Sequence, residues 1–283
     1  MTKPYESKFV YPPDFFDPKL PKGVMSPSQL DTYRRCPRQY MYAYVEGLIS
    51  PPGIAMAKGR SVHHGAEVTH QHTIDHGEPL PLEAATQSVA DHYDGELEDI
   101  EDLEGNDPGL LKDRTLYCFQ AYYTQAVPKI RPVKVEHAFA QKIGIVPMRG
   151  LIDLVDEITA APDDLTVDDD PENPPMLEVV SDLKVVKAKW SAQKVRHAPQ
   201  LTIYAIVENQ SRIRVDLLLD QKSGIRYAPL RAERTAIDKR LVIEDIEETA
   251  YNIKEGYFPR CDPTSWACTT SFCGYYERCR GAK

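Results

Sequence analysis

A carboxylate and an ammonium group stand two residues apart in an apolar segment, at Asp182 and Lys184. If the segment is a strand, residues two apart point to the same face, so both side chains project together. Burying such a pair for stability alone is unfavourable, because desolvation offsets much of the attraction. The preceding apolar segment carries another carboxylate, Asp153, just after Gly150. Two carboxylates from neighbouring strands could hold a divalent cation through oxygen ligands.

Two further pairs of polar residues have helical spacing. His63 lies four residues after Gly59 and four before Glu67, so an imidazole and a carboxylate can share one helix face. The imidazole could complete the metal shell. Gln200 and Tyr204 also lie one helical turn apart, and they offer an amide and a phenol to a bound phosphate or nucleotide.

The segments GRSVHHGAE, GLIDLVD, DLK and QLTIY follow one another in this order. This ordered set resembles the motif series of RecB-like nucleases in the PD-(D/E)XK superfamily. The resemblance extends from Ser26 to Cys279. It implies an α/β fold of the restriction-endonuclease type, with a mixed central sheet flanked by helices. It also implies a metal-dependent DNA exonuclease that acts on single strands or DNA ends.

The resemblance also assigns roles to the matching residues. The implied ligands of a catalytic Mg²⁺ or Mn²⁺ ion are His63, Asp153 and Asp182. Lys184 would orient water and stabilise charge, and Gln200 and Tyr204 would support the DNA, whereas the role of Glu67 stays open. Because Mg²⁺ prefers oxygen ligands, His63 should favour Mn²⁺ somewhat.

Four of the six cysteines crowd the C-terminal end of the chain, which indicates metal ligation rather than scattered disulfides. Cys268, Cys273 and Cys279 are close enough in sequence for one metal centre. The family resemblance implies that Cys36 supplies a fourth thiolate to a [4Fe–4S] cluster, as in the AddB nuclease domain and in nucleases that serve CRISPR adaptation. The commoner spacing of the first two C-terminal ligands is two residues, whereas here it is four. Two alternatives therefore stay open: Cys261 in place of Cys268, and zinc in place of iron.

Other polar or aromatic residues are expected to have structural roles. Cys118 should be an ordinary buried residue. Glu136 should belong to a strand surface rather than to a ligand set. Trp266 should pack beside the cysteines, with stacking on a base of single-stranded DNA as the alternative. The remaining histidines of the same segment as His63 should be exposed on a helix; they are His64, His70, His72 and His76.

Periodicity and turn residues predict the elements that position these groups. A helix should begin after a Ser26 cap, with Gln29 completing a capping box and Pro37 kinking the segment. The other predicted helices are 59–72, 82–104, 109–127, 199–209 and 236–255, and the predicted strands are 135–145, 148–158, 176–186, 212–220 and 225–230. We expect an extended arm over 1–25 and one nuclease domain over 26–283. This domain should contain a helical insertion at about 60–127, a core at about 133–257, an acidic loop at 161–175, and a cysteine-rich segment, 258–283, joined to Cys36.

The formal net charge of −9 is unhelpful for binding a polyanion, but its distribution is uneven. Acid concentrates in 94–107 and 163–172, and base in 34–38 and 184–197, so an acidic face and a local basic groove could coexist. No apolar run approaches the roughly 20 residues of a membrane span, and the cysteine usage suits a reducing cytoplasm. The expected partner is DNA, with a homo-oligomer or a recombination partner also open. The alternative function is a DNA-binding or assembly protein with the same fold that does not cut, for example in spacer capture or recombination.

Overall fold

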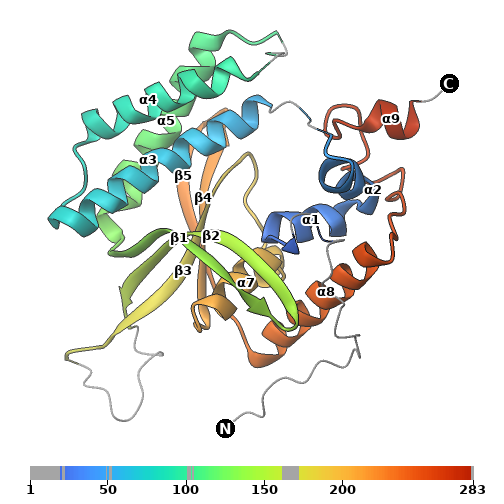
Figure 1. The fold of residues 1–283 in the computed structure, drawn as a ribbon. Helices are drawn as coiled ribbons and strands as arrows, with labels where there is room; N and C mark the ends of the chain where they lie inside the picture. The colour runs from blue at the N-terminus through green and yellow to red at the C-terminus, as the bar shows by residue number, and fades with distance from the viewer. Residues whose placement is uncertain are drawn as a thin grey trace. The chain divides into compact units, whose positions relative to one another are not determined.

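Alternating and continuous apolar segments form the central sheet of the protein, and the segments with helical periodicity cover it. The structure, a computed structural model, describes residue 20 and residues 23–48, 50, 53–100, 103, 105–160 and 172–281. The helices are α1 (Pro27–Arg35), α2 (Pro37–Tyr40), η2 (Met41–Val45), α3 (Ile54–His76), α4 (Leu82–Glu98), α5 (Pro108–Gln125), η3 (Val127–Lys129), α6 (Ala192–Arg196), α7 (Pro199–Val207), α8 (Ala236–Lys254) and α9 (Tyr276–Arg280) (Figure 1). The strands are β1 (Pro132–Ile143), β2 (Val146–Thr159), β3 (Met176–Val186), β4 (Arg212–Gln221) and β5 (Gly224–Glu233).

The five strands form one mixed sheet in the order β1-β2-β3-β4-β5. Strand β3 pairs antiparallel with β2 and parallel with β4, and β4 pairs antiparallel with β5. The parallel pair needs a crossover connection, which α6 and α7 provide. The predicted α/β class, with a mixed sheet flanked by helices, is confirmed.

The chain divides into two compact units. The sheet unit comprises Pro52–His137 and Leu151–Arg234, and the cysteine unit comprises Met1–Pro51, Ala138–Gly150 and Thr235–Lys283. None of the helices in the described part of the chain is both long and apolar enough to cross a bilayer.

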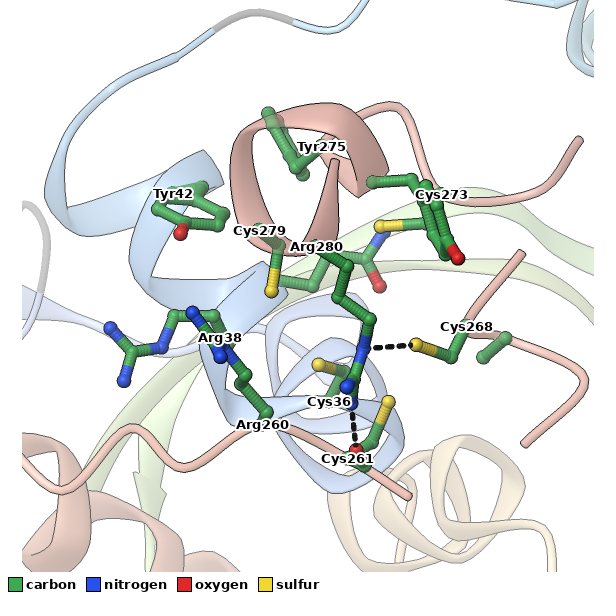
Figure 2. Close-up of a pocket in the computed structure, with 13 residues that line it drawn as sticks. Cys36, Arg38, Tyr42, Arg260, Cys261, Cys268, Cys273, Tyr275, Cys279 and Arg280 are labelled. Atoms are coloured by element: carbon green, nitrogen blue, oxygen red, sulfur yellow. Dashed lines mark hydrogen bonds between the residues drawn. The ribbon is translucent and has the colours of Figure 1, made fainter. Parts of the chain in front are cut away.

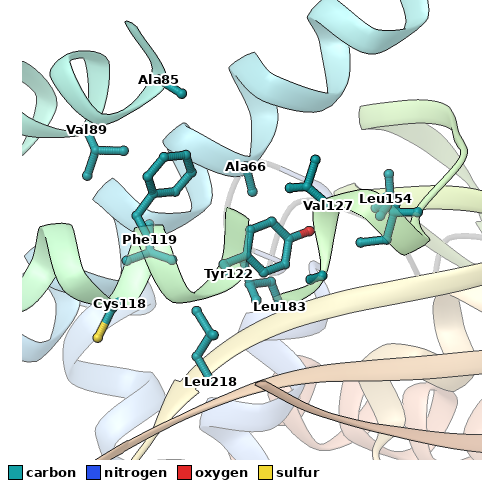
Figure 3. Packing of buried hydrophobic residues seen from close by; sticks show 13 residues of the cluster. Ala66, Ala85, Val89, Cys118, Phe119, Tyr122, Val127, Leu154, Leu183 and Leu218 are labelled. Carbon is teal, nitrogen blue, oxygen red and sulfur yellow. The ribbon is translucent and has the colours of Figure 1, made fainter. Parts of the chain in front are cut away.

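The sheet unit buries apolar side chains on both faces of its strands. On one face, residues of α3, α4 and α5 pack around Phe119 and Tyr122 against Leu154, Leu183 and Leu218 of three successive strands (Figure 3). On the other face, Leu201 and Ala205 of α7 pack against alternate residues of β4, namely Ile213, Val215, Leu217 and Leu219. Strand β4 is buried on both faces, as a central strand with a parallel neighbour should be. Its second face is not wholly apolar, because it carries Arg214 and Asp216 beside Leu218, and Arg214 forms buried ion pairs with Asp156 and Asp216, each at 2.7 Å.

The cysteine unit joins residues from both ends of the described chain. The Tyr33 hydroxyl donates to the carbonyl of Tyr257 over 2.6 Å, and the Tyr275 hydroxyl donates to the carbonyl of Leu48 over 2.7 Å. The ring of Tyr40 stacks on that of Phe258 with a centroid separation of 6.2 Å. These contacts place Cys36 and the C-terminal cysteines in one unit.

Several predicted boundaries change in the structure. Ser26 caps α1 by accepting from the Gln29 N–H over 3.2 Å, but the Gln29 side-chain oxygen is buried without a partner, so only half of the predicted capping box forms. Pro37 interrupts the helix rather than kinking it, because Cys36 adopts an extended conformation between α1 and α2. Most of the predicted arm, residues 1–19 and 21–22, and residues 161–171 of the acidic loop lie outside the described residues.

Candidate active site and cysteine pocket

Asp153 and Asp182 lie where strands β2 and β3 stop pairing. The antiparallel register runs from Thr159 opposite Met176 to Leu154 opposite Ser181. Immediately beyond it, the backbone N–H of Leu183 donates to Asp153 Oδ2 over 3.1 Å rather than to a strand carbonyl. The Asp153 carboxylate thus accepts a hydrogen bond from the backbone of β3 at the point where the pairing of β2 and β3 ends.

Asp182 and Lys184 project together from β3, as their spacing predicts. Lys184 Nζ lies 2.9 Å from the Asp182 carboxylate, which is 1% exposed, whereas the Lys184 side chain is partly exposed. Burial, reinforced by the nearby Asp153, raises the pKa of Asp182 to about 6, although Lys184 and His63 act in the opposite direction. The pair therefore presents a fixed cation at the surface, anchored to a carboxylate beneath it.

His63, Asp153 and Glu136 form the tightest group of potential metal ligands in the described part of the chain. One ligand atom from each lies within 4.8 Å of the other two, and His63 Nδ1 is 3.2 Å from Asp153 Oδ2. The first two residues were predicted to converge. Glu136, predicted to be strand surface, is the third member of this group. Asp182 is not among the three, but its carboxylate interacts electrostatically with Asp153 and His63.

The backbone of Glu136 explains both its position and why the sequence pattern conceals it. Within β1 this residue has a φ of 42°, in the left-handed region that residues with a Cβ rarely adopt. This departure from regular strand geometry changes the direction of the side chain that alternation would predict. Burial raises the pKa of Glu136 to about 7, with further contributions from the Asp153, Glu67 and Asp182 carboxylates. In the sequence, the only indication that Glu136 could be a ligand is that an acidic residue stands within a strand-like segment.

The chemistry of this group fits a divalent cation. One imidazole and two carboxylates suit Mn²⁺ and, less well, Mg²⁺, and none of the three is a thiol. The same hollow is lined by Glu67, whose carboxylate also lies 3.7 Å from His64 Nδ1. Clustered, partly buried carboxylates repel one another, and a bound cation would relieve that repulsion.

Gln200 and Tyr204 lie together on α7, with Gln200 Nε2 donating to the Tyr204 hydroxyl over 2.7 Å. Burial, together with the Asp153 and Asp182 carboxylates, raises the pKa of the Tyr204 phenol far above its usual value. The Tyr204 phenol therefore remains protonated, and it lies close enough to Asp153 and Asp182 to feel their charges. All the predicted catalytic residues lie in the sheet unit.

The cysteine unit contains a pocket lined by Cys36, Cys261, Cys268, Cys273 and Cys279 (Figure 2). None of these cysteines forms a disulfide. Arg280 lies among them and donates to Cys268 Sγ over 2.9 Å and to the Cys261 carbonyl over 2.7 Å. Burial acts to raise the pKa of the Cys36 thiol, but hydrogen bonds from Cys261, Gln39 and Arg38 outweigh it and hold that pKa below its usual value.

A low pKa favours the thiolate, which is the form that ligates metals. The structure thus brings all four predicted cysteine ligands into one pocket and adds Cys261 to them.

The chain belongs to the PD-(D/E)XK nuclease superfamily, whose family model matches residues 24–280. A solved structure described provisionally as an exonuclease, from Eubacterium rectale, is similar at 9% identity, with 92% of each chain covered and a TM-score of 0.48. The crystal structure of the protein SSO0001 is similar at 14% identity, with 91% of this chain and 86% of that chain covered and a TM-score of 0.40. No curated protein matches the sequence.

Proposed function

We propose that this nuclease is a metal-dependent DNA exonuclease of the RecB-like type that hydrolyses phosphodiester bonds in single-stranded DNA or at DNA ends. The observation that carries the proposal is the convergence of His63, Glu136 and Asp153 within 4.8 Å, in a member of a nuclease superfamily. The Asp182–Lys184 pair, on the strand next to that of Asp153, adds a cation to the same site.

In this proposal His63, Asp153 and Asp182 hold the divalent ion, and Glu136 joins them. The ion, when bound, would activate a water molecule and neutralise charge on the phosphoryl oxygens. Lys184 supplies a fixed positive charge where negative charge develops during cleavage, and Asp182 holds the ammonium group in place. Gln200 would offer a hydrogen bond to the DNA, and Tyr204, whose side chain is buried, would support the Gln200 amide from beneath.

The decisive experiment compares the wild type with Lys184→Ala on end-labelled linear DNA, with Mg²⁺ or Mn²⁺. Loss of a preorganised charge of this kind should lower the cleavage rate by about a hundredfold or more. Lys222→Ala, in the exposed β4–β5 turn, is the matched control and should cleave normally. Equal activity of Lys184→Ala and wild type would remove the proposed site.

Substrate form tests the exonuclease assignment. The enzyme should degrade linear single-stranded DNA and leave covalently closed circles intact, whereas cleavage of circles would establish an endonuclease. Tight DNA binding without cleavage in either metal would instead support the alternative, a DNA-binding or assembly protein of the same fold.

We also propose that Cys36, Cys268, Cys273 and Cys279 hold a [4Fe–4S] cluster, in a reducing cytoplasm. One pocket is lined by all four of these cysteines, and none of them forms a disulfide, which supports the proposal of a thiolate-ligated centre. Zinc bound by the same thiolates is the alternative. The hydrogen bond from Arg280 to Cys268 Sγ would then help to set the reduction potential of the cluster.

Metal analysis of anaerobically purified protein tests this assignment. Brown protein with broad visible absorption and about four iron atoms per chain is expected. Cys268→Ser should lose iron, whereas Cys261→Ser and Cys118→Ser should keep it. Iron retained in Cys268→Ser but lost in Cys261→Ser would show that Cys261, and not Cys268, is the ligand. Colourless protein containing zinc would refute the cluster.

The family match covers residues of both compact units. This supports our proposal that 26–283 acts as one nuclease domain, with the cysteine-rich segment as its C-terminal part and an arm before it.

A further inference from the structure

An exposed pair of aromatic rings lies in the cysteine-rich segment. Trp266 is 68% exposed and Phe272 is 43% exposed, although the sequence predicts that Trp266 packs beside the cysteines. The two rings meet edge to face, with centroids 4.5 Å apart and planes at 69°. Each ring therefore supports the other while much of their apolar surface stays in contact with water.

A guanidinium group completes this cluster. The Arg35 guanidinium carbon lies 5.4 Å from the centre of the Phe272 ring, in cation–π range. The Arg35 side chain is oriented by hydrogen bonds from Nε to Gln39 Oε1 (3.1 Å) and from a terminal nitrogen to Thr32 Oγ1 (3.4 Å). The cation is thus held against the aromatic pair by α1, and all three side chains belong to the cysteine unit.

The sequence segments that carry the cluster are basic, whereas the whole chain is acidic. The segment 258–283 has four basic and two acidic residues, and 34–38 has three arginines, in a chain of net charge −9. Arg34 and Arg278 form ion pairs with Asp245 and Glu46, so the charge available to a ligand is smaller than this count. A guanidinium group held against exposed aromatic rings matches a ligand that combines phosphates with flat, apolar rings.

We propose that Trp266, Phe272 and Arg35 form a stacking platform for the unpaired bases of single-stranded DNA. Bases stack on aromatic and guanidinium planes irrespective of sequence, because every base has a π face. Duplex DNA hides these faces except at its ends, so the platform selects unpaired strands. The inference rests on the proposed function for its choice of DNA as the ligand.

The test is a titration with a single-stranded oligothymidylate of about 15 nucleotides in metal-free buffer, where cleavage does not contribute. The chain has two tryptophans, and Trp190, beneath the Lys194 ammonium group, belongs to the sheet unit. Intrinsic fluorescence should be quenched in the wild type and in Trp190→Phe, but not in Trp266→Ala. Trp266→Ala should bind the oligonucleotide about tenfold more weakly, and Trp266→Phe should keep most of the affinity.

Controls separate stacking from other effects. Tyr117→Ala, which removes a 58% exposed ring from α5 in the sheet unit, should bind normally. Affinity for a blunt duplex should be unchanged in Trp266→Ala, and iron content measured on the same preparations checks the fold near Cys268. Unchanged oligonucleotide affinity in Trp266→Ala would overturn the proposal. Equal weakening in Trp266→Phe, or a dimer that dissociates in Trp266→Ala, would also overturn it, because the patch would then serve another purpose.

The nuclease assay is independent of this measurement. Quenching of Trp266 fluorescence by the oligonucleotide is measured without metal, so it does not depend on whether Lys184→Ala abolishes cleavage. The platform and the catalytic site can therefore fail separately.

Discussion

At the scale of single residues, Glu136 combines a strained backbone with a potential metal ligand. A left-handed conformation costs a residue with a Cβ of the order of 1–3 kcal/mol, and such strain concentrates at functional sites. His63 and Asp153 could be placed together from the sequence because their spacing fits regular elements. Glu136 could not, because its position depends on the departure from regular strand geometry.

Two substitutions at this position should separate strain from ligation. Glu136→Ala and Glu136→Gly both remove the carboxylate, so both should bind Mn²⁺ at least about tenfold more weakly, by titration calorimetry. Glycine accepts a φ of 42° without steric cost, so Glu136→Gly should be about 1 kcal/mol more stable than Glu136→Ala in urea unfolding. Glu83→Gln, at an exposed position of α4, is the control for Mn²⁺ affinity. If the alanine variant were the more stable of the two, the strain argument would be refuted.

His70 is a second residue whose environment the sequence did not reveal. Predicted to be exposed, it is 2% exposed and its Nε2 lies 2.7 Å from the Tyr122 hydroxyl, while its Nδ1 is buried without a partner. Burial lowers the pKa of His70 to about 4, and the charges of Asp216 and Arg214 act in opposite directions on it. The His70 imidazole is therefore neutral in the folded protein at neutral pH.

This burial gives a pH dependence of known sign. Between about pH 6.5 and 4 the unfolded chain binds a proton at His70 that the folded protein does not, so this contribution to stability is lost as pH falls. The stability advantage of the wild type over His70→Gln should shrink by about 2 kcal/mol between about pH 7.5 and 5, in urea titrations. Carboxyl groups with raised pKa values, such as Asp156, act oppositely but equally in both proteins and cancel in the difference. His76→Gln, on the exposed end of α3, should show no such trend, and a constant difference for His70→Gln would contradict the assignment.

At the scale of elements, long periodic segments were predictable and irregular ones were not. Helix α3 was predicted as 59–72 and extends over Ile54–His76; in the added turns only Ala57 is buried, so a hydrophobic pattern gives little indication of them. The buried face of the helix carries mainly small residues, such as Ser61, Gly65, Ala66 and Thr69. The five-residue helices α6 and α9 are too short for periodicity to show. The element that carries His63 is therefore positioned by close helix packing rather than by bulky apolar residues.

Gly65 is the point where α3 approaches its neighbours most closely. A Cβ there would lie 2.6 Å from two ring carbons of Phe119 on α5 and closer still to Val89 on α4. Gly65→Ala should therefore lower the free energy of unfolding by about 1–2 kcal/mol, because overpacking outweighs a helix-propensity gain of about 1 kcal/mol. Gly59→Ala in the same helix meets nothing within 4 Å and should be stabilised by up to about 1 kcal/mol. Thermal unfolding of the pair checks the comparison, and equal stabilisation of both would show that α3 is not held by this contact.

At the scale of the whole molecule, the two compact units gain their stability in different ways. The sheet unit has continuous apolar clusters on both faces of its strands. The C-terminal segment of the cysteine unit has little regular structure after α8, and α9 contains no buried residue. The family resemblance implied that Cys36 meets the C-terminal cysteines, but the presence of Cys261 in the same pocket depends on the path of an irregular chain, which periodicity cannot give.

Loss of the proposed cluster should therefore loosen one part of the protein and spare the other. A segment with few apolar contacts opens at low free energy unless ligands hold it, so Cys273→Ser should lose hydrogen-exchange protection around Cys36 and in residues 257–281. Protection in β3, β4 and α5 should remain, because Phe119, Tyr122 and Leu218 stay buried there. Cys118→Ser, which places a hydroxyl in that apolar cluster, should give the opposite pattern. Simultaneous loss of protection in both regions of Cys273→Ser would mean that the cluster supports the whole chain, and the nuclease site would then depend on iron for its fold.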